Sequence, residues 1–127
     1  MIRNRIVVLN RAAVTVAAQT DAHFASVTMP KAGKLVGCNV NAVSVAGTAA
    51  RTFQVYKAGS VAAAMASATT AMLATVATLA DTPLPANGVV KMDGSQNFIE
   101  GETLYVKYTT GAGTTSTDTT ITLSVTY

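Results

Sequence analysis

Two carboxylates and two tyrosines lie close together in EGETLYVKY, residues 100–108. Paired carboxylates can act as the acid and the base of a glycosidase, but only when they face each other across a substrate. Glu100 and Glu102 instead flank a glycine, at the point where the chain turns into a predicted strand. We expect their carboxylates to remain in water or to accept backbone N–H bonds, and we predict no catalytic role for them.

The remaining ionisable residues form no recognisable catalytic or metal-binding pattern. His23 is the only histidine, and its sequence neighbours do not define a Ser/His/Asp triad, which is recognised by geometry. Cys38 is the only cysteine, so one chain can form neither a disulfide nor a Cys-based metal site, and its apolar neighbours predict a buried side chain. The acids are dispersed singly, without a calcium-loop pattern. We therefore predict that the protein is not an enzyme and has no metal, cofactor or small-molecule substrate.

Positive charge is concentrated near the N-terminus. Arg3, Arg5 and Arg11 account for the formal net charge of +3, because the other six basic residues are matched by six acids. In an extended chain these arginines share a face with Val7 and Leu9. A nucleic-acid-binding surface gathers Lys and Arg on one face with aromatic residues between them, whereas the bases here lie singly along the chain. The sequence predicts no nucleic-acid partner.

Residues 58–80 form an uncharged stretch that is about long enough to cross a bilayer. Most of its residues are Ala, Ser or Thr, whose transfer to lipid gains little free energy, so we expect no membrane span. Apolar residues at spacings of three and four fit an amphipathic helix. The many threonines and the strand patterns on either side favour short strands and a long loop instead. The sequence leaves both alternatives open.

Alternation of apolar and polar residues, bounded by Gly, Pro, Asn and Asp, recurs through most of the chain. This pattern predicts an all-β fold, a single antiparallel β-sandwich. The predicted strands are residues 2–10, 12–18, 22–29, 35–45, 52–58, 88–92, 102–110 and 119–127. In the fourth strand the alternation places Val36 and Cys38 on one side, and in the seventh Leu104, Val106 and Tyr108 share one face. Because only 6% of the residues are aromatic, we expect a core of small side chains.

The chain divides into two segments. Residues 1–20 are an extended N-terminal arm or the first strand, and residues 21–127 are the β-sandwich domain. In the first segment Ile6 and Val8 lie on the face opposite the arginines. Its backbone can pair with a partner protein while the guanidinium groups meet acceptors on that partner.

Several stretches resemble small structural proteins of tailed bacteriophages, namely capsid decoration or cement proteins. They are MIRNRIVVLNRAAVTVAA, PKAGKLVGCNVNAVSV, FQVYKAG and FIEGETLYVKY, the last of which is similar to strand openings in virion jelly-roll sandwiches. The resemblance covers most of residues 24–127 in pattern. It implies a jelly-roll-like sandwich on the outer surface of the capsid, often a symmetric homo-oligomer such as a trimer or dimer, that reinforces contacts between neighbouring major capsid proteins.

Two functions fit these observations. As a decoration protein, the chain binds the capsid through Arg3, Arg5 and Arg11 and is located on the outside of the virion. Because the first residues lack the long apolar stretch of a signal peptide, we expect synthesis in the host cytoplasm. The alternative is a phage fibre or tail module that recognises a host-surface glycan, a function that commonly uses exposed aromatic platforms. The chain has only four Tyr, three Phe and no Trp, and this composition favours the function of a decoration protein.

Overall fold

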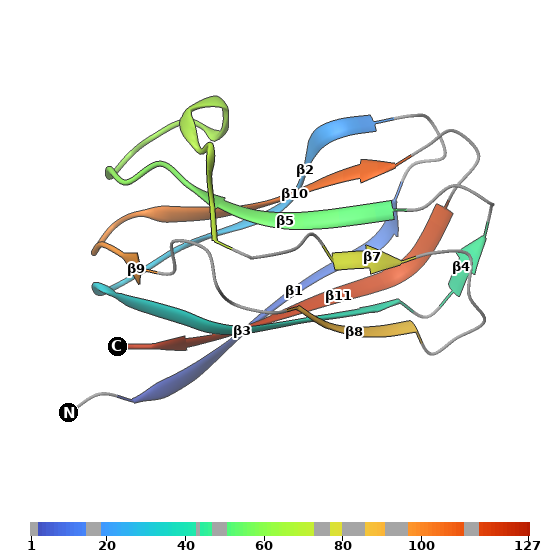
Figure 1. The fold of residues 1–127 in the computed structure, drawn as a ribbon, viewed down its shortest axis with the longest axis horizontal. Helices are drawn as coiled ribbons and strands as arrows, with labels where there is room; N and C mark the ends of the chain where they lie inside the picture. The colour runs from blue at the N-terminus through green and yellow to red at the C-terminus, as the bar shows by residue number, and fades with distance from the viewer. Residues whose placement is uncertain are drawn as a thin grey trace.

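Two antiparallel β-sheets packed face to face form the fold (Figure 1). The computed structural model describes residues 3–14, 19–42, 44–46, 51–72, 77–79, 86–90, 97–110 and 115–127. The first sheet has the strand order β1 (Asn4–Val14), β11 (Thr115–Thr126), β3 (Gly33–Ala42) and β8 (Ala86–Val90), with β4 (Ser44–Ala46) on β11 and β9 (Asn97–Phe98) on β3. The second has the order β2 (Gln19–Thr28), β10 (Thr103–Thr110), β5 (Arg51–Lys57) and β6 (Thr70–Ala71), with β7 (Ala77–Leu79) on β5. The predicted all-β sandwich is confirmed.

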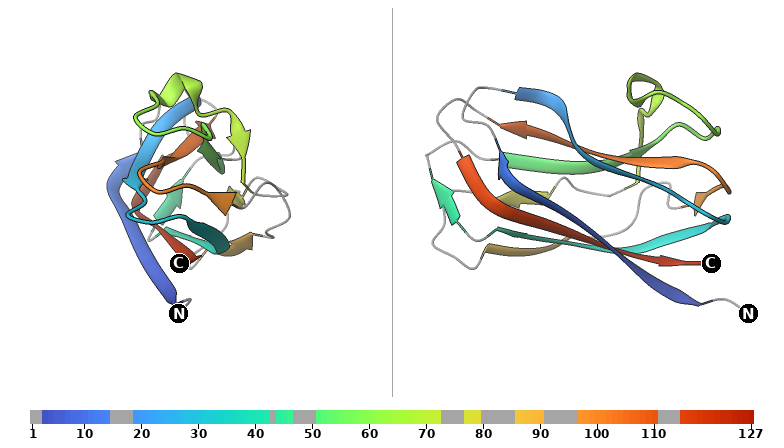
Figure 2. Two further views of the ribbon diagram at one scale, coloured as in Figure 1. Left: turned by 90° about the vertical axis from the view of Figure 1, so that its left-hand side faces the viewer. Right: turned by 180° about the vertical axis from the view of Figure 1, so that it is seen from behind.

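The order of the strands is that of a jelly roll. Strands β1, β2, β3 and β5 alternate between the two sheets, and β8, β10 and β11 alternate again in the second half of the chain. The first strand therefore pairs with the last, and β2 pairs with β10, both in antiparallel register. Two Greek keys interleaved in this way across two sheets form a jelly roll, and Figure 2 shows the sheets lying one above the other.

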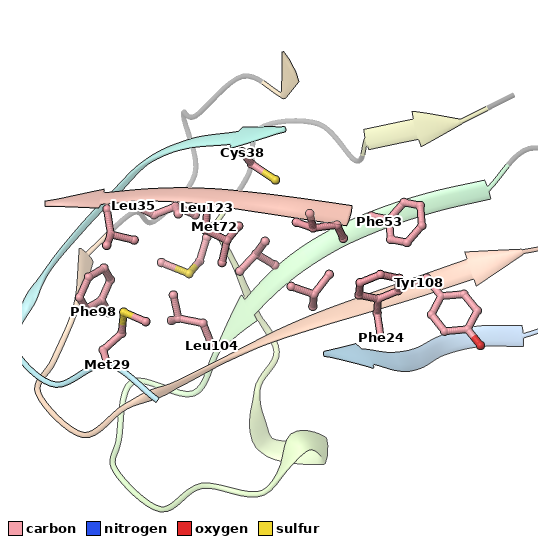
Figure 3. Packing of buried hydrophobic residues seen from close by; sticks show 14 residues of the cluster. Phe24, Met29, Leu35, Cys38, Phe53, Met72, Phe98, Leu104, Tyr108 and Leu123 are labelled. Atoms are coloured by element: carbon pink, nitrogen blue, oxygen red, sulfur yellow. The ribbon is translucent and has the colours of Figure 1, made fainter. Parts of the chain in front are cut away.

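The core lies between the sheets and consists of the inward-facing residues of both. In β10, Leu104, Val106 and Tyr108 are at most 3% exposed, as the alternation predicts. Phe24 of β2 and Phe53 of β5 pack edge to face with their ring centroids 5.4 Å apart, near Tyr108 (Figure 3). The expectation of a core of small side chains is wrong, because the fold collects the large apolar side chains there, including all three phenylalanines and two methionines.

A β-bulge in β3 changes which residues of that strand face the core. The register between β3 and β11 shifts beside Gly37, so Val36 is an extra residue with no partner in the ladder. Leu35 and Cys38 are both buried, whereas Val36 is 44% exposed. The predicted placement of Val36 and Cys38 on one side of the strand is therefore wrong. Val36 is itself the extra residue of the bulge, and its side chain lies on the outer face.

Residues 58–69 form a loop that projects beyond β5 and β10, hereafter the 58–69 loop (Figure 1). It contains a single 3-10 turn, Met65–Ser67, and is followed by β6. Of the ambiguous stretch 58–80, residues 58–72 and 77–79 are described, and they form a loop and two short strands rather than an amphipathic helix. Within the described part of the chain, no helix has the length and apolar character needed to span a membrane.

Of residues 1–20, for which the sequence left an arm or a strand open, residues 4–14 form β1 at one edge of the first sheet, and residues 19 and 20 begin β2. β1 pairs with β11 along its whole length without a register shift. No strand among the described residues pairs with its other edge, hereafter the open edge. Within the described structure, the first strand is thus hydrogen-bonded into the sheet through one edge alone.

Candidate assembly surface

The two carboxylates at the start of β10 have different environments. Glu102 is 1% exposed, and its two carboxylate oxygens accept backbone N–H bonds, one from Ile99 at 3.1 Å and one from Gly59. Glu100 is exposed to solvent. Because both oxygens of Glu102 are occupied and Glu100 faces water, this corner does not present two carboxylates to a common substrate.

Two outward-facing side chains of β10 also hold the 58–69 loop. The Tyr105 hydroxyl donates a hydrogen bond to the carbonyl oxygen of Ala63 at 2.8 Å. The Lys107 ammonium donates to the carbonyl oxygen of Ala68 at 2.7 Å and lies 4.8 Å from the centre of the Tyr56 ring. Lys107 is only 8% exposed, although the alternation places it on the outer face of the sheet. The loop therefore covers this part of the outer face and is fixed to it.

The backbone hydrogen bonds of β1 alternate between its two edges. Arg3 and Tyr127 exchange two backbone bonds, of 2.9 and 3.1 Å. The odd-numbered residues of the strand therefore bond to β11, because bonded and non-bonded pairs alternate in an antiparallel ladder. The backbone groups that point to the open edge belong to the even-numbered residues, which include Asn4, Ile6, Val8 and Asn10.

The side chains of β1 divide in the same way as its backbone groups. Val7 and Leu9 are half-buried and pack against the core. Ile6 and Val8 project from the outer face of the first sheet and are 70% and 61% exposed, beside the hydroxyl side chains of β11. The exposed apolar side chains thus belong to the residues whose backbone groups point to the open edge.

The arginines that the sequence singled out all belong to this edge of the molecule. Arg3 precedes β1 and is exposed. Arg5 is also exposed, and its guanidinium carbon lies 5.8 Å from the centre of the Tyr127 ring, within the range of a cation–π interaction. Arg11 lies further along β1, opposite Thr119. All three occupy odd-numbered positions, and β1 contains no acid.

A hollow of about 440 Å³ lies next to this edge, between β9, the start of β3 and the end of β11. Tyr127, Lys34 and Phe98 are among its lining residues, and Lys34 is the only charged one. Because the lining contains a base and no acid, it offers neither an acid–base pair nor metal-binding carboxylates.

Cys38 and His23 lie away from this surface. Cys38 is buried as predicted, and burial raises the pKa of its thiol from 9.0 to about 12. His23 is exposed on β2, with its ring edge-on to that of Tyr105 at 6.5 Å. Among the residues that the structure describes, no three His, Cys, Asp or Glu side chains are gathered where they could hold a metal ion.

Ile6 and Val8 belong to this surface although the charge pattern points to the arginines alone. The sequence signal for them is IVVL, residues 6–9, four apolar residues in a row where a half-exposed strand would alternate. Continuous apolar residues are typical of a strand that is covered on both faces. In the described structure only the inner face of β1 packs on the core, so the run indicates that the outer face is also suited to a contact.

The jelly roll is shared with viral capsid proteins. No known protein family and no curated protein matches the sequence. A chain of the cyanophage Pam1 capsid asymmetric unit is similar in structure, with a TM-score of 0.50 and 19% identity over 98% of this chain and 84% of that chain. A mutant VP2 protein of infectious bursal disease virus has a TM-score of 0.50 and 11% identity, over 98% of this chain and 35% of VP2. At these identities the similarity shows a common fold.

Proposed function

We propose that this chain is a structural virion protein that binds the outer surface of a phage capsid and stabilises contacts between its subunits. The observation that carries this proposal is the extent of one structural match, in which 98% of this chain aligns with 84% of a chain in the Pam1 capsid asymmetric unit. The match thus extends over one whole jelly roll in both chains. The chain spans only about a third of VP2. A jelly roll of this size is suited to binding a shell that another protein forms.

The partner in this proposal is the major capsid protein, and the contact residues are Arg3, Arg5 and Arg11. Guanidinium groups on an exposed strand can meet carboxylates or carbonyl oxygens of the capsid surface. Copies of the chain associate as a symmetric trimer or dimer through uncharged surfaces. Val61 and Ile99 suit such a contact. Both are exposed, and both lie near the start of β10, where the 58–69 loop is held. Apolar side chains exclude water without repelling a second copy.

The glycan-binding alternative has no observation in its favour. All four tyrosines and all three phenylalanines lie in described segments, and all of them are buried or half-buried. Tyr105, which is half-buried, uses its hydroxyl to hold the 58–69 loop. The described surface therefore lacks the exposed aromatic platform on which a sugar ring stacks, and we do not propose this function.

Particles of the phage that encodes this chain test the proposal. Wild-type particles are compared with particles from which the gene has been deleted, by cryo-electron microscopy and by heating until the heads release DNA. We expect the deletion to remove density present in many copies on the outer surface and to lower the release temperature, and purified protein to restore both. Absence of the chain from mature particles, a position inside the shell, or a few copies at the tail would overturn the proposal.

A further inference from the structure

The open edge of β1 is long and poorly protected. The strand has eleven residues, no proline and no register shift, and it exposes Ile6 and Val8. Proteins usually shorten, bend or interrupt such edges, because an unpaired row of N–H and C=O groups accepts strands from other molecules. Charged side chains also protect an edge strand from unwanted pairing, and the only charged residues of β1 are arginines. The open edge is therefore suited to pairing with a strand of one specific partner protein.

The arginines determine which partner can cover the open edge. Pairing two copies of β1 would bring the arginines of both strands into one seam with no acid in either strand. Like charges on neighbouring strands destabilise their pairing, so a second copy is disfavoured. A partner strand with carboxylates beside Arg3 and Arg5 would instead form charge-assisted hydrogen bonds with them. The charge of this edge thus selects an acidic strand from a different protein.

Strand geometry also specifies where the apolar residues of that partner lie. A residue on an added strand shares a sheet face with the β1 residue that it opposes. Arg3 and Arg5 therefore require acids at two alternate positions of the partner. Residues 6–9 are apolar on both faces, so the four partner residues opposite them are expected to be apolar as well. The matching segment is extended, with two acids at alternate positions next to four apolar residues.

We infer that the open edge of β1 binds an extended acidic segment of a partner protein as an added strand, with carboxylates opposite Arg3 and Arg5 and apolar side chains opposite Ile6 and Val8. This inference rests on the proposed function, in which the partner is the capsid protein, and it adds the mode and the chemistry of binding. Main-chain bonds to the even-numbered residues supply affinity, and the flanking side chains supply specificity, as in other cases of strand addition.

Two proline substitutions separate pairing at the open edge from the stability of the fold. Val8→Pro removes an N–H that points to the open edge, so the chain keeps its bonds to β11. Val7→Pro removes an N–H on the side that pairs with Leu123 and should destabilise the sheet. Thermal denaturation of both variants checks this difference, and we expect Val8→Pro to remain folded under the conditions of the binding assay.

The binding probe is a synthetic peptide with glutamates opposite Arg3 and Arg5, valines opposite residues 6–9 and a soluble Gly/Ser tail. A matched peptide carries lysines in place of the glutamates. We expect the glutamate peptide to bind the wild-type chain, and to bind Val8→Pro and Arg3→Glu at least about tenfold more weakly. The lysine peptide should not bind. Equal binding of the two peptides, full binding to Val8→Pro, or no binding of the glutamate peptide would each overturn the inference.

Amide hydrogen exchange identifies the edge that is used. In the complex with the glutamate peptide, exchange should slow at the even-numbered amides of β1, Asn4, Ile6, Val8 and Asn10, because these gain hydrogen bonds. Exchange at Val7 and Leu9, which already face β11, should change much less. Protection confined to any other part of the chain would show that the peptide binds elsewhere and would contradict the inference.

Particles lacking this chain distinguish failure of the inference from failure of the proposed function. We expect the wild-type chain to decorate such particles and Val8→Pro to decorate them at least about tenfold more weakly. If both decorate equally, the inference about the open edge is wrong and the proposed function stands. If neither decorates the particles, the proposed function is wrong, while the peptide experiment still decides whether the edge accepts an acidic strand.

Discussion

Replacing Glu102 by glutamine removes one charge from the corner at the start of β10 and changes the shape of the side chain very little. The carboxylate accepts backbone N–H bonds from Ile99 and Gly59. Glutamine keeps one carbonyl oxygen for one of these N–H groups, but its NH₂ group then faces the other, donor against donor. One backbone N–H of a buried corner is left without an acceptor.

The cost follows from the energies of these bonds. A hydrogen bond to a charged acceptor contributes about 1.5–3 kcal/mol, and a buried donor without an acceptor costs about 1–3 kcal/mol. Burying a neutral amide instead of a carboxylate offsets part of this loss. We expect Glu102→Gln to lower the free energy of unfolding by about 2 kcal/mol. For a chain of 127 residues with average unfolding entropy, this corresponds to a Tm lower by about 8 °C.

The matched control is Glu100→Gln, which makes the same chemical change at an exposed neighbour. We expect its Tm to stay within about 2 °C of the wild type, as for most surface substitutions. Calorimetry on the three proteins measures Tm, and hydrogen exchange at the Gly59 amide reports whether the start of the 58–69 loop opens. Equal Tm values for the two variants, together with unchanged exchange at Gly59, would refute the structural role assigned to Glu102.

Three further outcomes are expected from other positions. A Cβ at Gly33 would lie 2.0 Å from a carbonyl oxygen of β11, whereas a Cβ at Gly59, where φ is +78°, meets no atom within 4 Å. Urea denaturation should therefore show a loss of about 3 kcal/mol for Gly33→Ala and about 1 kcal/mol for Gly59→Ala, and similar losses would contradict the close approach. Lys107→Met removes the donor to the Ala68 carbonyl oxygen and should cost about 1–2 kcal/mol in the same assay; an unchanged midpoint would show that the bond contributes nothing. Because the pKa of the Cys38 thiol is raised from 9.0 to about 12, its protonated form stabilises the fold below pH 9, and this contribution is lost as pH rises from 9 toward 12. Between these pH values the free energy of unfolding should fall more steeply with rising pH in the wild type than in Cys38→Ala. Parallel curves for the two proteins would contradict the raised pKa.

Alternation in the sequence predicted the inward-facing side chains of β10, whose pairing with β5 has no register shift. In β10 it identified Leu104, Val106 and Tyr108 as core residues, and all three are buried. It failed at Val36, because the bulge there is a property of the pairing between β3 and β11. Those strands are far apart along the chain, so no local pattern could report the extra residue.

The candidate surface was predictable only in part. Arg3, Arg5 and Arg11 were visible as an excess of charge that no nearby acid balances. The sequence did not predict that Lys107 is buried, because its burial depends on the 58–69 loop crossing the outer face of β10. Nor could it show that β1 has an open edge. Whether a strand is central or at an edge depends on the order of the strands in the sheet, and local sequence patterns do not indicate that order.

The strand order of the jelly roll also affects when the protein can fold. β11 lies between β1 and β3, and β10 lies between β2 and β5, so an inner strand of each sheet comes from the last quarter of the chain. During synthesis, the earlier strands have no partner on one side, and their apolar inner faces stay in water. Pairing between distant segments is also slow. The nascent chain is therefore exposed to aggregation and proteolysis until its last strand has left the ribosome.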